Sequence, residues 1–190
     1  MLNKTRKTKE TDIAISLELY GQGKSKIDTG VGFLDHMLES FSKHSLIDLD
    51  IKCVGDTHID DHHSVEDVGI VLGSLLNEAI YPAKGIERFG SASVVMDEAC
   101  IECDLDLSNR PFLYHSLNVA GKVGQFDTEL VEEFFRAFIL NAGISAHVVQ
   151  KRGTNKHHII EAAFKSVAVA IRRATMKNER IGIPSTKDVL

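Results

Sequence analysis

The feature that most constrains how this chain can fold is a motif, His-His-x-x-Glu, that occurs twice. His62-His63-Ser64-Val65-Glu66 is followed 95 residues later (157 − 62) by His157-His158-Ile159-Ile160-Glu161. Each copy opens an apolar pattern with helical spacing, so each places two imidazoles and a carboxylate on the first turns of a helix. The duplication predicts one site built from two related halves of the chain.

The rest of the pattern follows the same order in both halves: strand, helix, strand, His-His-x-x-Glu helix, with extra strands in the second half. Alternating polar and apolar residues predict strands, and apolar residues at helical spacing predict helices. The predicted strands are 13–19, 47–53, 93–96, 100–107, 112–119 and 145–151, and the predicted helices are 31–43, 62–80, 128–141 and 157–176. We therefore expect an α+β fold made by tandem duplication of two similar half-domains, residues 1–88 and 89–190. Each half-domain would be a mostly antiparallel sheet with two helices packed on one face, and together they would form one compact unit.

Aligning the two halves adds a second pair of candidate ligands. A shift of 97 residues (133 − 36) superposes the apolar positions of helix 31–43 on those of helix 128–141 and puts His36 on Glu133. A shift of 88 (98 − 10) aligns strand 13–19 with strand 100–107 and puts Glu10 on Glu98. His36 alone on an apolar helix would more often be a buried or edge histidine. Its repeat partner Glu133 is the reason to favour ligation for both residues.

The composition limits which partners this chain can bind and in which compartment it functions. A net charge of −5 at pH 7 argues against binding of nucleic acid by the chain as a whole, although a local basic cluster could still hold an anionic substrate. Three cysteines cannot complete a disulfide framework, which favours a reducing compartment. Residues 1–9 have no apolar signal core, and the longest apolar stretch is too short to span a bilayer. We expect a cytoplasmic protein that binds neither membrane nor nucleic acid.

The ligand types indicate which metals would suit such a site. Imidazole and carboxylate ligands without thiolate suit Mn(II), Fe(II) or Zn(II). The two histidines of one motif are offset by about 100° around the helix, so they need not bind the same ion. One motif offers too few ligands for a closed coordination sphere, whereas two motifs with His36 and Glu133 can serve two ions. An isolated pair of histidines at a helix start is more often a solvated cap; its duplication favours metal binding here.

Six segments in this order resemble the imidazoleglycerol-phosphate dehydratase family, and the resemblance runs from Arg6 to Leu190. They are Glu10-Thr11, Gly32-Phe33-Leu34-Asp35-His36-Met37, Asp61-His62-His63-Ser64-Val65-Glu66-Asp67, Ser108-Asn109-Arg110-Pro111, Gly153-Thr154-Asn155-Lys156-His157-His158-Ile159-Ile160-Glu161 and Pro184-Ser185-Thr186-Lys187. The resemblance implies a hydro-lyase of histidine biosynthesis that converts imidazole glycerol phosphate to imidazole acetol phosphate and water. It also implies two Mn²⁺ ions per active site and a homo-oligomer, an octahedral 24-mer with active sites between subunits. Glu133 departs from relatives that have His in that position.

The resemblance also assigns roles to individual residues. Glu10 is expected to be the base that handles the proton on C2 of the substrate. The metal ligands would be His36, His62, His63, Glu66, Glu133, His157, His158 and Glu161. The residues that bind substrate and its phosphate would be Glu10, His44, Arg88, Arg110, Lys165, Ser185 and Lys187. Taken singly, each basic residue would be solvated surface, and Glu10 would be a solvated carboxylate at a strand start.

The expected chemistry explains the need for metal. The C2 proton is not next to a carbonyl, so a general base alone has little to work with. A deprotonated substrate imidazole held by two ions can push electrons toward C3 and expel the hydroxyl. Loss of the C2 proton then gives an enol that tautomerises to the ketone, and the metals act as Lewis acid and template.

Two other functions compete with this one. A different dimetal enzyme, such as a hydrolase with a metal-bound hydroxide, would use the same ligands, and a metal-storage or scaffold protein could use the ions only to join subunits. The carboxylate-bridged di-iron proteins carry Glu-x-x-His, the reverse order, which counts against that class. The basic residues and Glu10 favour an enzyme over a scaffold.

Overall fold

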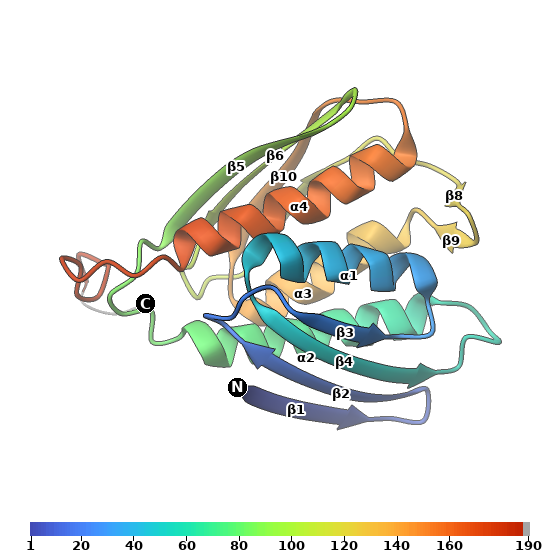
Figure 1. Ribbon diagram of the computed structural model, residues 1–190, viewed down its shortest axis with the longest axis horizontal. Coiled ribbons are helices and arrows are strands. Elements are labelled where there is room, and N and C mark those ends of the chain that lie inside the picture. Colours follow the sequence, from blue (N-terminus) through green and yellow to red (C-terminus); the bar gives the residue numbers. More distant parts are fainter. Residues whose placement is uncertain (188–190) are drawn as a thin grey trace.

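In the computed structural model, which describes residues 1–187, four helices lie between two four-stranded sheets (Figure 1). Residues 188–190, the end of the expected second half, lie outside the described range. The first sheet has the order β1-β2-β4-β3. The elements that supply this sheet and its two helices are β1 (Leu2–Lys7), β2 (Thr11–Glu18), β3 (Ser25–Asp28), α1 (Gly32–Ser45), β4 (Asp48–Gly55) and α2 (His62–Ile80).

The second sheet repeats this arrangement with the order β5-β6-β10-β7. Its elements are β5 (Phe89–Met96), β6 (Ala99–Asp106), β7 (Phe112–Ser116), α3 (Leu130–Ala142), β10 (Ser145–Arg152) and α4 (Lys156–Ala174). A small additional hairpin, β8 (Lys122–Val123) with β9 (Phe126–Asp127), lies between β7 and α3. The expected α+β fold is therefore confirmed.

The layers follow from where the apolar side chains lie. In β2, Ile13, Ile15 and Leu17 are buried on one face while the intervening positions are exposed or half-buried, so this sheet covers the core with one side only. The helices of the two halves then pack on each other, α2 against α3 and α1 against α4 (Figure 1). The result is a sheet, two layers of helices and a second sheet. Within residues 1–187, no helix is both long and apolar enough to cross a bilayer.

The duplication extends to the hydrogen-bond register of the sheets. Leu2 pairs with Leu17 in the first sheet, and Gly90 pairs with Leu105 in the second, so both positions shift by 88 (90 − 2 and 105 − 17). The helix ends repeat as well: Leu46 and Gly143, 97 residues apart (143 − 46), both adopt left-handed backbone with φ of 62° and 69°. The alignment read from the sequence is thus reproduced residue by residue in the backbone.

Two strands of the first half are missing from the sequence prediction. Strand β1 is an edge strand with a mostly polar, exposed sequence, and β3 has only four residues. Neither shows the buried alternation that identifies a strand. The second half does carry extra strands, as expected, but they are the β8–β9 hairpin, since each half contributes four strands to its main sheet.

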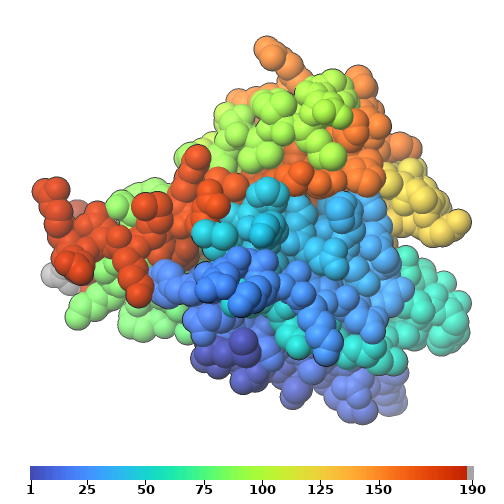
Figure 2. Space-filling model, viewed as in Figure 1, coloured from blue at the N-terminus to red at the C-terminus, as the bar shows by residue number. Residues whose placement is uncertain are grey.

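The four helices all begin at the same edge of the molecule, beside the β8–β9 hairpin (Figure 1). The C-terminal segment that follows α4 projects from the opposite end (Figures 1 and 2). Both His-His-x-x-Glu motifs occupy helix starts, so they lie at the first of these two ends.

Candidate active site

At the start of each His-His-x-x-Glu helix a side chain accepts backbone N–H groups of the first turn: the N-cap Asn155 in α4, and Asp60, which precedes the N-cap Asp61, in α2. Asn155 accepts hydrogen bonds from the backbone N–H groups of His157 (2.9 Å) and His158 (3.3 Å) at the start of α4. Asp60 accepts one from the backbone N–H of His62 (2.9 Å) at the start of α2. These caps fix the first helical turn, and with it the directions in which the histidine rings leave the backbone.

Three of the eight predicted ligands come together in one group, His36, His157 and Glu161. The Oε2 atom of Glu161 lies 3.0 Å from Nε2 of His157 and 3.4 Å from Nε2 of His36. One ligand atom from each residue lies within 4.8 Å of the other two. Ligand–metal distances of roughly 2.0–2.2 Å keep the ligands of one ion within about 4.4 Å, so small rotations of the exposed rings would complete the geometry. The donor set therefore fits a divalent transition metal, with open positions for further ligands.

Glu161 is the buried member of this group, and its surroundings keep it ionised. Burial alone would raise the pKa of Glu161, but the hydrogen bond and charge of Lys165, together with His157, lower it below its usual value. Lys165 Nζ lies 2.7 Å from Glu161 Oε1, one helical turn further along α4. The carboxylate is therefore in the state that a metal ligand requires.

The corresponding residues of the other copy form a looser group. His62 and Glu66 face each other on α2 with 3.8 Å between Nε2 and Oε2, and both are about 40% exposed. Glu133 lies half-buried in the first turn of α3, the helix that packs on α2. Among residues 1–187 the gathered three-ligand group is the one around Glu161, so the structure does not bring His62, Glu66 and Glu133 together to the same degree.

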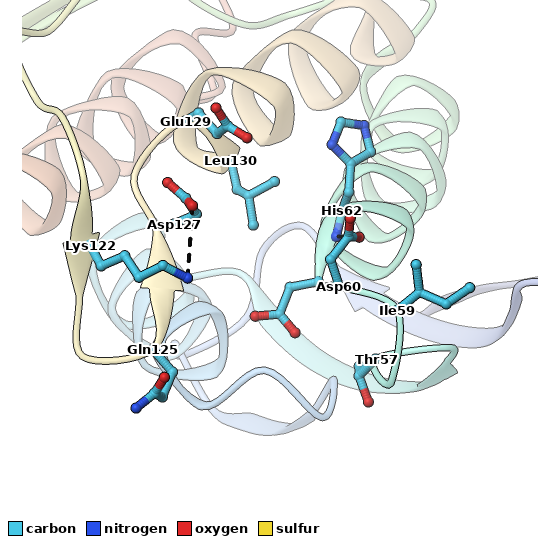
Figure 3. A pocket seen from close by; sticks show the side chains of 10 residues that line it. Thr57, Ile59, Asp60, His62, Lys122, Gln125, Asp127, Glu129 and Leu130 are labelled. Carbon is cyan, nitrogen blue, oxygen red and sulfur yellow. Dashed lines mark hydrogen bonds and ion pairs between the residues drawn. The ribbon is translucent and has the colours of Figure 1, made fainter.

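A cavity of about 340 Å³ lies beside His62, between the β4–α2 loop and the β8–β9 hairpin (Figure 3). Its walls are strongly acidic, with Asp60, Asp127 and Glu129 against the single cation Lys122, which is 3.8 Å from Asp127. Such walls favour cations at this edge of the molecule.

The second histidine of each motif is held by a carboxylate that sequence reasoning missed. Nδ1 of His63 lies 3.1 Å from both oxygens of Asp56, and Nδ1 of His158 lies 2.7 Å from Glu98 Oε2. These hydrogen bonds raise the pKa of both histidines, and the bond from His158 is the main cause that lowers the pKa of Glu98 to about 2. A carboxylate on Nδ1 fixes the ring and leaves Nε2 available to a metal. The signal in the sequence that points to Glu98 is its equivalence to Glu10.

Glu10 lies in the turn between β1 and β2, and its side chain is half-exposed. Its Oε1 atom is 3.8 Å from Nε2 of His63. The backbone of the turn is fixed by Thr8, whose hydroxyl accepts from the N–H of Glu10 (3.1 Å) and of Thr11 (3.0 Å). The carboxylate is therefore placed next to a predicted metal ligand and remains free to act.

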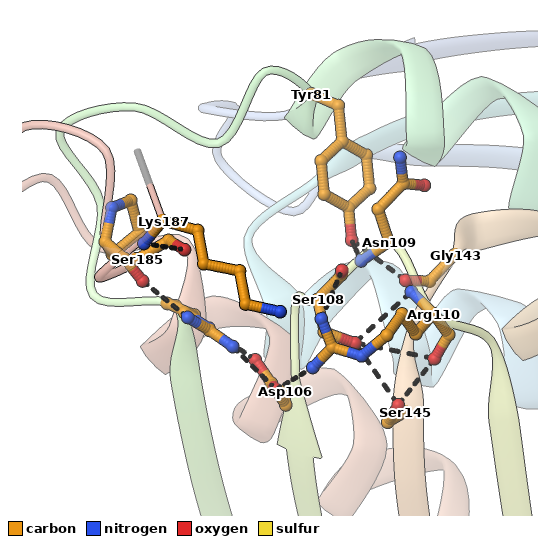
Figure 4. A network of polar contacts seen from close by, with 11 residues as sticks. Tyr81, Asp106, Ser108, Asn109, Arg110, Gly143, Ser145, Ser185 and Lys187 are labelled. Carbon is orange, nitrogen blue, oxygen red and sulfur yellow. Dashed lines mark hydrogen bonds and ion pairs between the residues drawn. The ribbon is translucent and has the colours of Figure 1, made fainter. Parts of the chain in front are cut away.

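Four of the predicted phosphate-binding residues line one groove of about 570 Å³: Arg88, Arg110, Ser185 and Lys187. Figure 4 shows Arg110, Ser185 and Lys187 around Asp106. Asp106 anchors this group through paired hydrogen bonds from Arg88 (2.7 and 3.0 Å), which raise the pKa of Arg88. Arg88 also donates to the carbonyl of Pro184 (2.5 Å), which ties the C-terminal segment to the groove. Arg110 and Lys187 are left facing solvent, so the groove is suited to an anion.

His44 and Lys165, also predicted to bind substrate, lie elsewhere, on the paired helices α1 and α4. Burial and then the charges of Lys165 and Arg172 lower the pKa of His44, which places these three residues in one electrostatic neighbourhood. Lys165 contacts Glu161, so this group adjoins the metal-type ligands.

The groove and the ligand group lie at opposite ends of α4. Arg88 donates its backbone N–H to the carbonyl of Ala174, the last residue of the helix, whereas His157 is in its first turn. Seventeen residues (174 − 157) at about 1.5 Å each separate these points by roughly 26 Å. One phosphorylated imidazole cannot span that distance within a single chain.

Comparison with known proteins identifies the relatives of this chain. The family model of imidazoleglycerol-phosphate dehydratase matches residues 29–171. The dehydratase of Sulfurimonas denitrificans is 76% identical over the whole of both chains, and that of Wolinella succinogenes is 67% identical over 98% of both. The crystal structure of the Staphylococcus aureus enzyme superposes with a TM-score of 0.83 at 44% identity, over 93% of this chain and 98% of that one. The Pyrococcus furiosus structure superposes with a TM-score of 0.85 at 38% identity, over 98% and 100%. The resemblance read from the motifs is confirmed.

Proposed function

Because the chain belongs to the imidazoleglycerol-phosphate dehydratase family, it is a hydro-lyase of histidine biosynthesis, and we propose how its site works. The substrate is D-erythro-imidazole glycerol phosphate, and the products are imidazole acetol phosphate and water. The site uses two Mn²⁺ ions held by the duplicated motifs. Two chains build each active site together, within a homo-oligomer that we propose to be an octahedral 24-mer.

One observation carries the two-chain site: the metal-type ligands and the anion groove lie about 26 Å apart along α4. Lys165 and His44 sit at the ligand end, while Arg88, Arg110, Ser185 and Lys187 sit at the other. A substrate that touches both sets must bind where the ligand end of one chain meets the groove of another. Closed symmetric assemblies repeat such an interface around every subunit.

The proposed ligands divide between the two repeats. His36, His157 and Glu161 form one group, and the repeat assigns Glu133, His62 and Glu66 to the equivalent group. His63 and His158 present Nε2 after Asp56 and Glu98 have taken Nδ1. When bound, the two ions supply Lewis acidity that stabilises the substrate imidazole in its deprotonated form.

Glu10 is the proposed base for the C2 proton. Its carboxylate lies beside His63 and is half-exposed, so a substrate bound at these ligands would meet it directly. Glu10 takes the C2 proton, the C3–O bond breaks, and the proton that Glu10 has taken is passed to the departing hydroxide to give water. The resulting enol between C2 and C3 tautomerises to the ketone by gaining a proton at C3 and losing the proton of the C2 hydroxyl.

The proposed phosphate site combines one cation held by protein contacts with two that face solvent. Arg88 is held by Asp106 and Pro184, while Arg110 and Lys187 face the open groove. Lys165 of a neighbouring chain would complete the set. We also propose a cytoplasmic location, which the three unpaired thiols Cys53, Cys100 and Cys103 support.

Two experiments test the chemistry. Complete removal of metal with a chelator should abolish conversion of imidazole glycerol phosphate, and added Mn²⁺ should restore it; turnover that survives complete removal would contradict the dimetal site. Glu10→Gln should retain metal and assembly and lose activity. Full activity in that variant would remove Glu10 as the base.

A third experiment tests whether two chains share a site. Arg110→Met and Lys165→Met should each be inactive alone. When the two variants are co-expressed and assemble at random, about one quarter of shared sites would contain intact Lys165 from one chain and intact Arg110 from the other. Recovered activity in the mixture supports the two-chain site. No recovery in a mixed assembly would mean that one chain supplies both residues.

A further inference from the structure

A small buried polar cluster lies beneath the turn that carries Glu10. Asp67 of α2 is only 6% exposed, and its carboxylate accepts a hydrogen bond from the hydroxyl of Thr11 and pairs with the guanidinium of Arg6. Arg6 is in β1 and Thr11 begins β2, so they flank the turn. One carboxylate therefore ties both sides of the Glu10 turn to the helix that carries His63. We call Arg6, Thr11, Ser64 and Asp67 the polar corner.

The polar corner is closely packed as well as hydrogen-bonded. Thr11, Ser64 and Asp67 are all buried. Gly55, at the end of β4, pairs with Thr11, and a Cβ added at Gly55 would come within 2.1 Å of the Ser64 hydroxyl. Strand, turn and helix thus approach each other without space for another methyl group, which leaves the turn little freedom to shift.

The second half of the chain builds the same corner from apolar residues. Shifts of 88 and 95 put Val94 and Ala99 at the places of Arg6 and Thr11, and Ile159 and Ala162 at those of Ser64 and Asp67. Ala99, Ile159 and Ala162 are buried, at most 1% exposed. The scaffold therefore does not need a charge at this point, and burying one costs free energy unless it is compensated.

The turn above the apolar corner differs in the same way. Glu98, the counterpart of Glu10, accepts hydrogen bonds from His158 (2.7 Å) and from the backbone N–H groups of Thr154 (3.1 Å) and Asn155 (2.7 Å). The Glu98 carboxylate is therefore held in place directly, by these three hydrogen bonds. The carboxylate of Glu10 is instead 3.8 Å from His63, so its position depends on the turn beneath it.

We propose that the polar corner positions Glu10: the Asp67 carboxylate, bound by Arg6 and Thr11, holds the base-bearing turn at a fixed place on the His63 helix. This inference rests on the proposed function, in which Glu10 takes the C2 proton. Arg6, Thr11 and Asp67 are positioning residues that act through Glu10. A misplacement of a catalytic group by about 1 Å costs on the order of a hundredfold in rate.

The second half supplies the substitutions for the test. In Arg6→Val/Thr11→Ala/Asp67→Ala the polar corner receives the residues that the same scaffold already accommodates in the other half, so the variant should fold. We expect unchanged assembly and manganese content, KM within about twofold, and kcat reduced by about 10- to 100-fold. The matched control is Lys4→Ala/Glu78→Ala, which removes an exposed ion pair between the same two elements, β1 and α2. It should leave kcat unchanged.

The outcomes separate the possible roles. A triple variant with full kcat would overturn the proposal, and so would one whose loss of kcat parallels a loss of manganese. Should the triple variant not fold, Thr11→Val and Thr11→Ser decide: a lower kcat in the first that the second restores supports positioning, and full kcat in Thr11→Val contradicts it. Glu10→Gln distinguishes this test from that of the base. If Glu10→Gln is active, Glu10 is not the base. If Glu10→Gln is inactive but the triple variant is fully active, Glu10 can still be the base and only the positioning role is refuted.

Discussion

Gly73 lies where α2 of the first half packs tightly on α3 of the second, and replacing it tests the helix packing directly. Gly69 and Gly73 are four apart on α2, so both face α3. A Cβ at Gly73 would lie 2.3 Å from the carbonyl oxygen of Phe138 and 3.0 Å from Cβ of Asn141. Normal carbon–oxygen contacts are about 3.3 Å or more, so α3 would have to retreat by about 1 Å.

The size of the effect follows from two opposing terms. Exchanging Gly for Ala inside a helix stabilises it by about 1 kcal/mol. Overpacking a well-packed interior costs about 1–3 kcal/mol, and the upper half of that range applies because a backbone carbonyl cannot swing aside. We therefore expect Gly73→Ala to lower the free energy of unfolding by about 1–2 kcal/mol, which corresponds to roughly 2–8 °C in melting temperature for a chain of this length.

The measurement is urea denaturation without metal, at matched protein concentration because the proposed assembly would itself add stability. Gly32→Ala is the control: Gly32 is also helical, but an added Cβ there meets nothing within 4 Å. That variant should be unchanged or slightly more stable. If the proposed ligands are right, manganese content should fall in Gly73→Ala, since a wider gap between α2 and α3 separates the proposed ligands Glu133 and His62. An increase in stability, as at an open helix position, would refute the packing argument.

Three further predictions test the core, the groove and the response to pH. Phe164→Ala should cost about 3–5 kcal/mol in urea denaturation because the ring of Phe164 lies 4.7 Å from that of Phe135, and Phe164→Leu should cost clearly less. Asp106→Asn should raise KM about tenfold with kcat nearly unchanged, since Arg88 loses its charged acceptor; an unchanged KM would place the phosphate elsewhere. Burial lowers the pKa of His115, so below about pH 6.5 the unfolded chain takes up a proton that the folded chain does not. Stability should fall as the pH drops through that window, and His115→Gln should flatten the dependence measured by denaturation at several pH values.

Most of the architecture could be predicted from the sequence, because the spacing of apolar residues along a strand or helix shows which of its faces is buried. The shift of 97 that aligned His36 with Glu133 reappears in the left-handed helix ends at Leu46 and Gly143. The sequence does not predict edge strand β1, because both faces of this strand are largely exposed and its residues therefore show no alternation of polar and apolar side chains.

The candidate site was only partly readable, for a different reason. Motif spacing identifies ligands on one helix but carries no information on which helix packs beside it. The carboxylates on the ring nitrogens of His63 and His158 come from different places, Asp56 after β4 and Glu98 in the β5–β6 turn. No single repeat offset predicts both, so the duplicated motif could not reveal them. The separation of Lys165 from Arg88 likewise depends on the length and direction of α4, which become visible once the helix is placed.

The helix pairing explains why the two halves stay together. Each pair joins one helix from each half: α1 packs on α4, and α2 on α3. The gathered ligand group therefore takes His36 from the first half and His157 with Glu161 from the second. We propose that residues 1–88 and 89–190 are two copies of one ancestral half that fold as a single unit, because neither half alone can cover its helices or assemble those three ligands. Because both copies are needed for the ligand groups, the equivalent residues outside those groups can take different roles. Glu10 and Glu98 are such a pair: the Glu10 carboxylate lies 3.8 Å from His63, whereas the Glu98 carboxylate is hydrogen-bonded to His158.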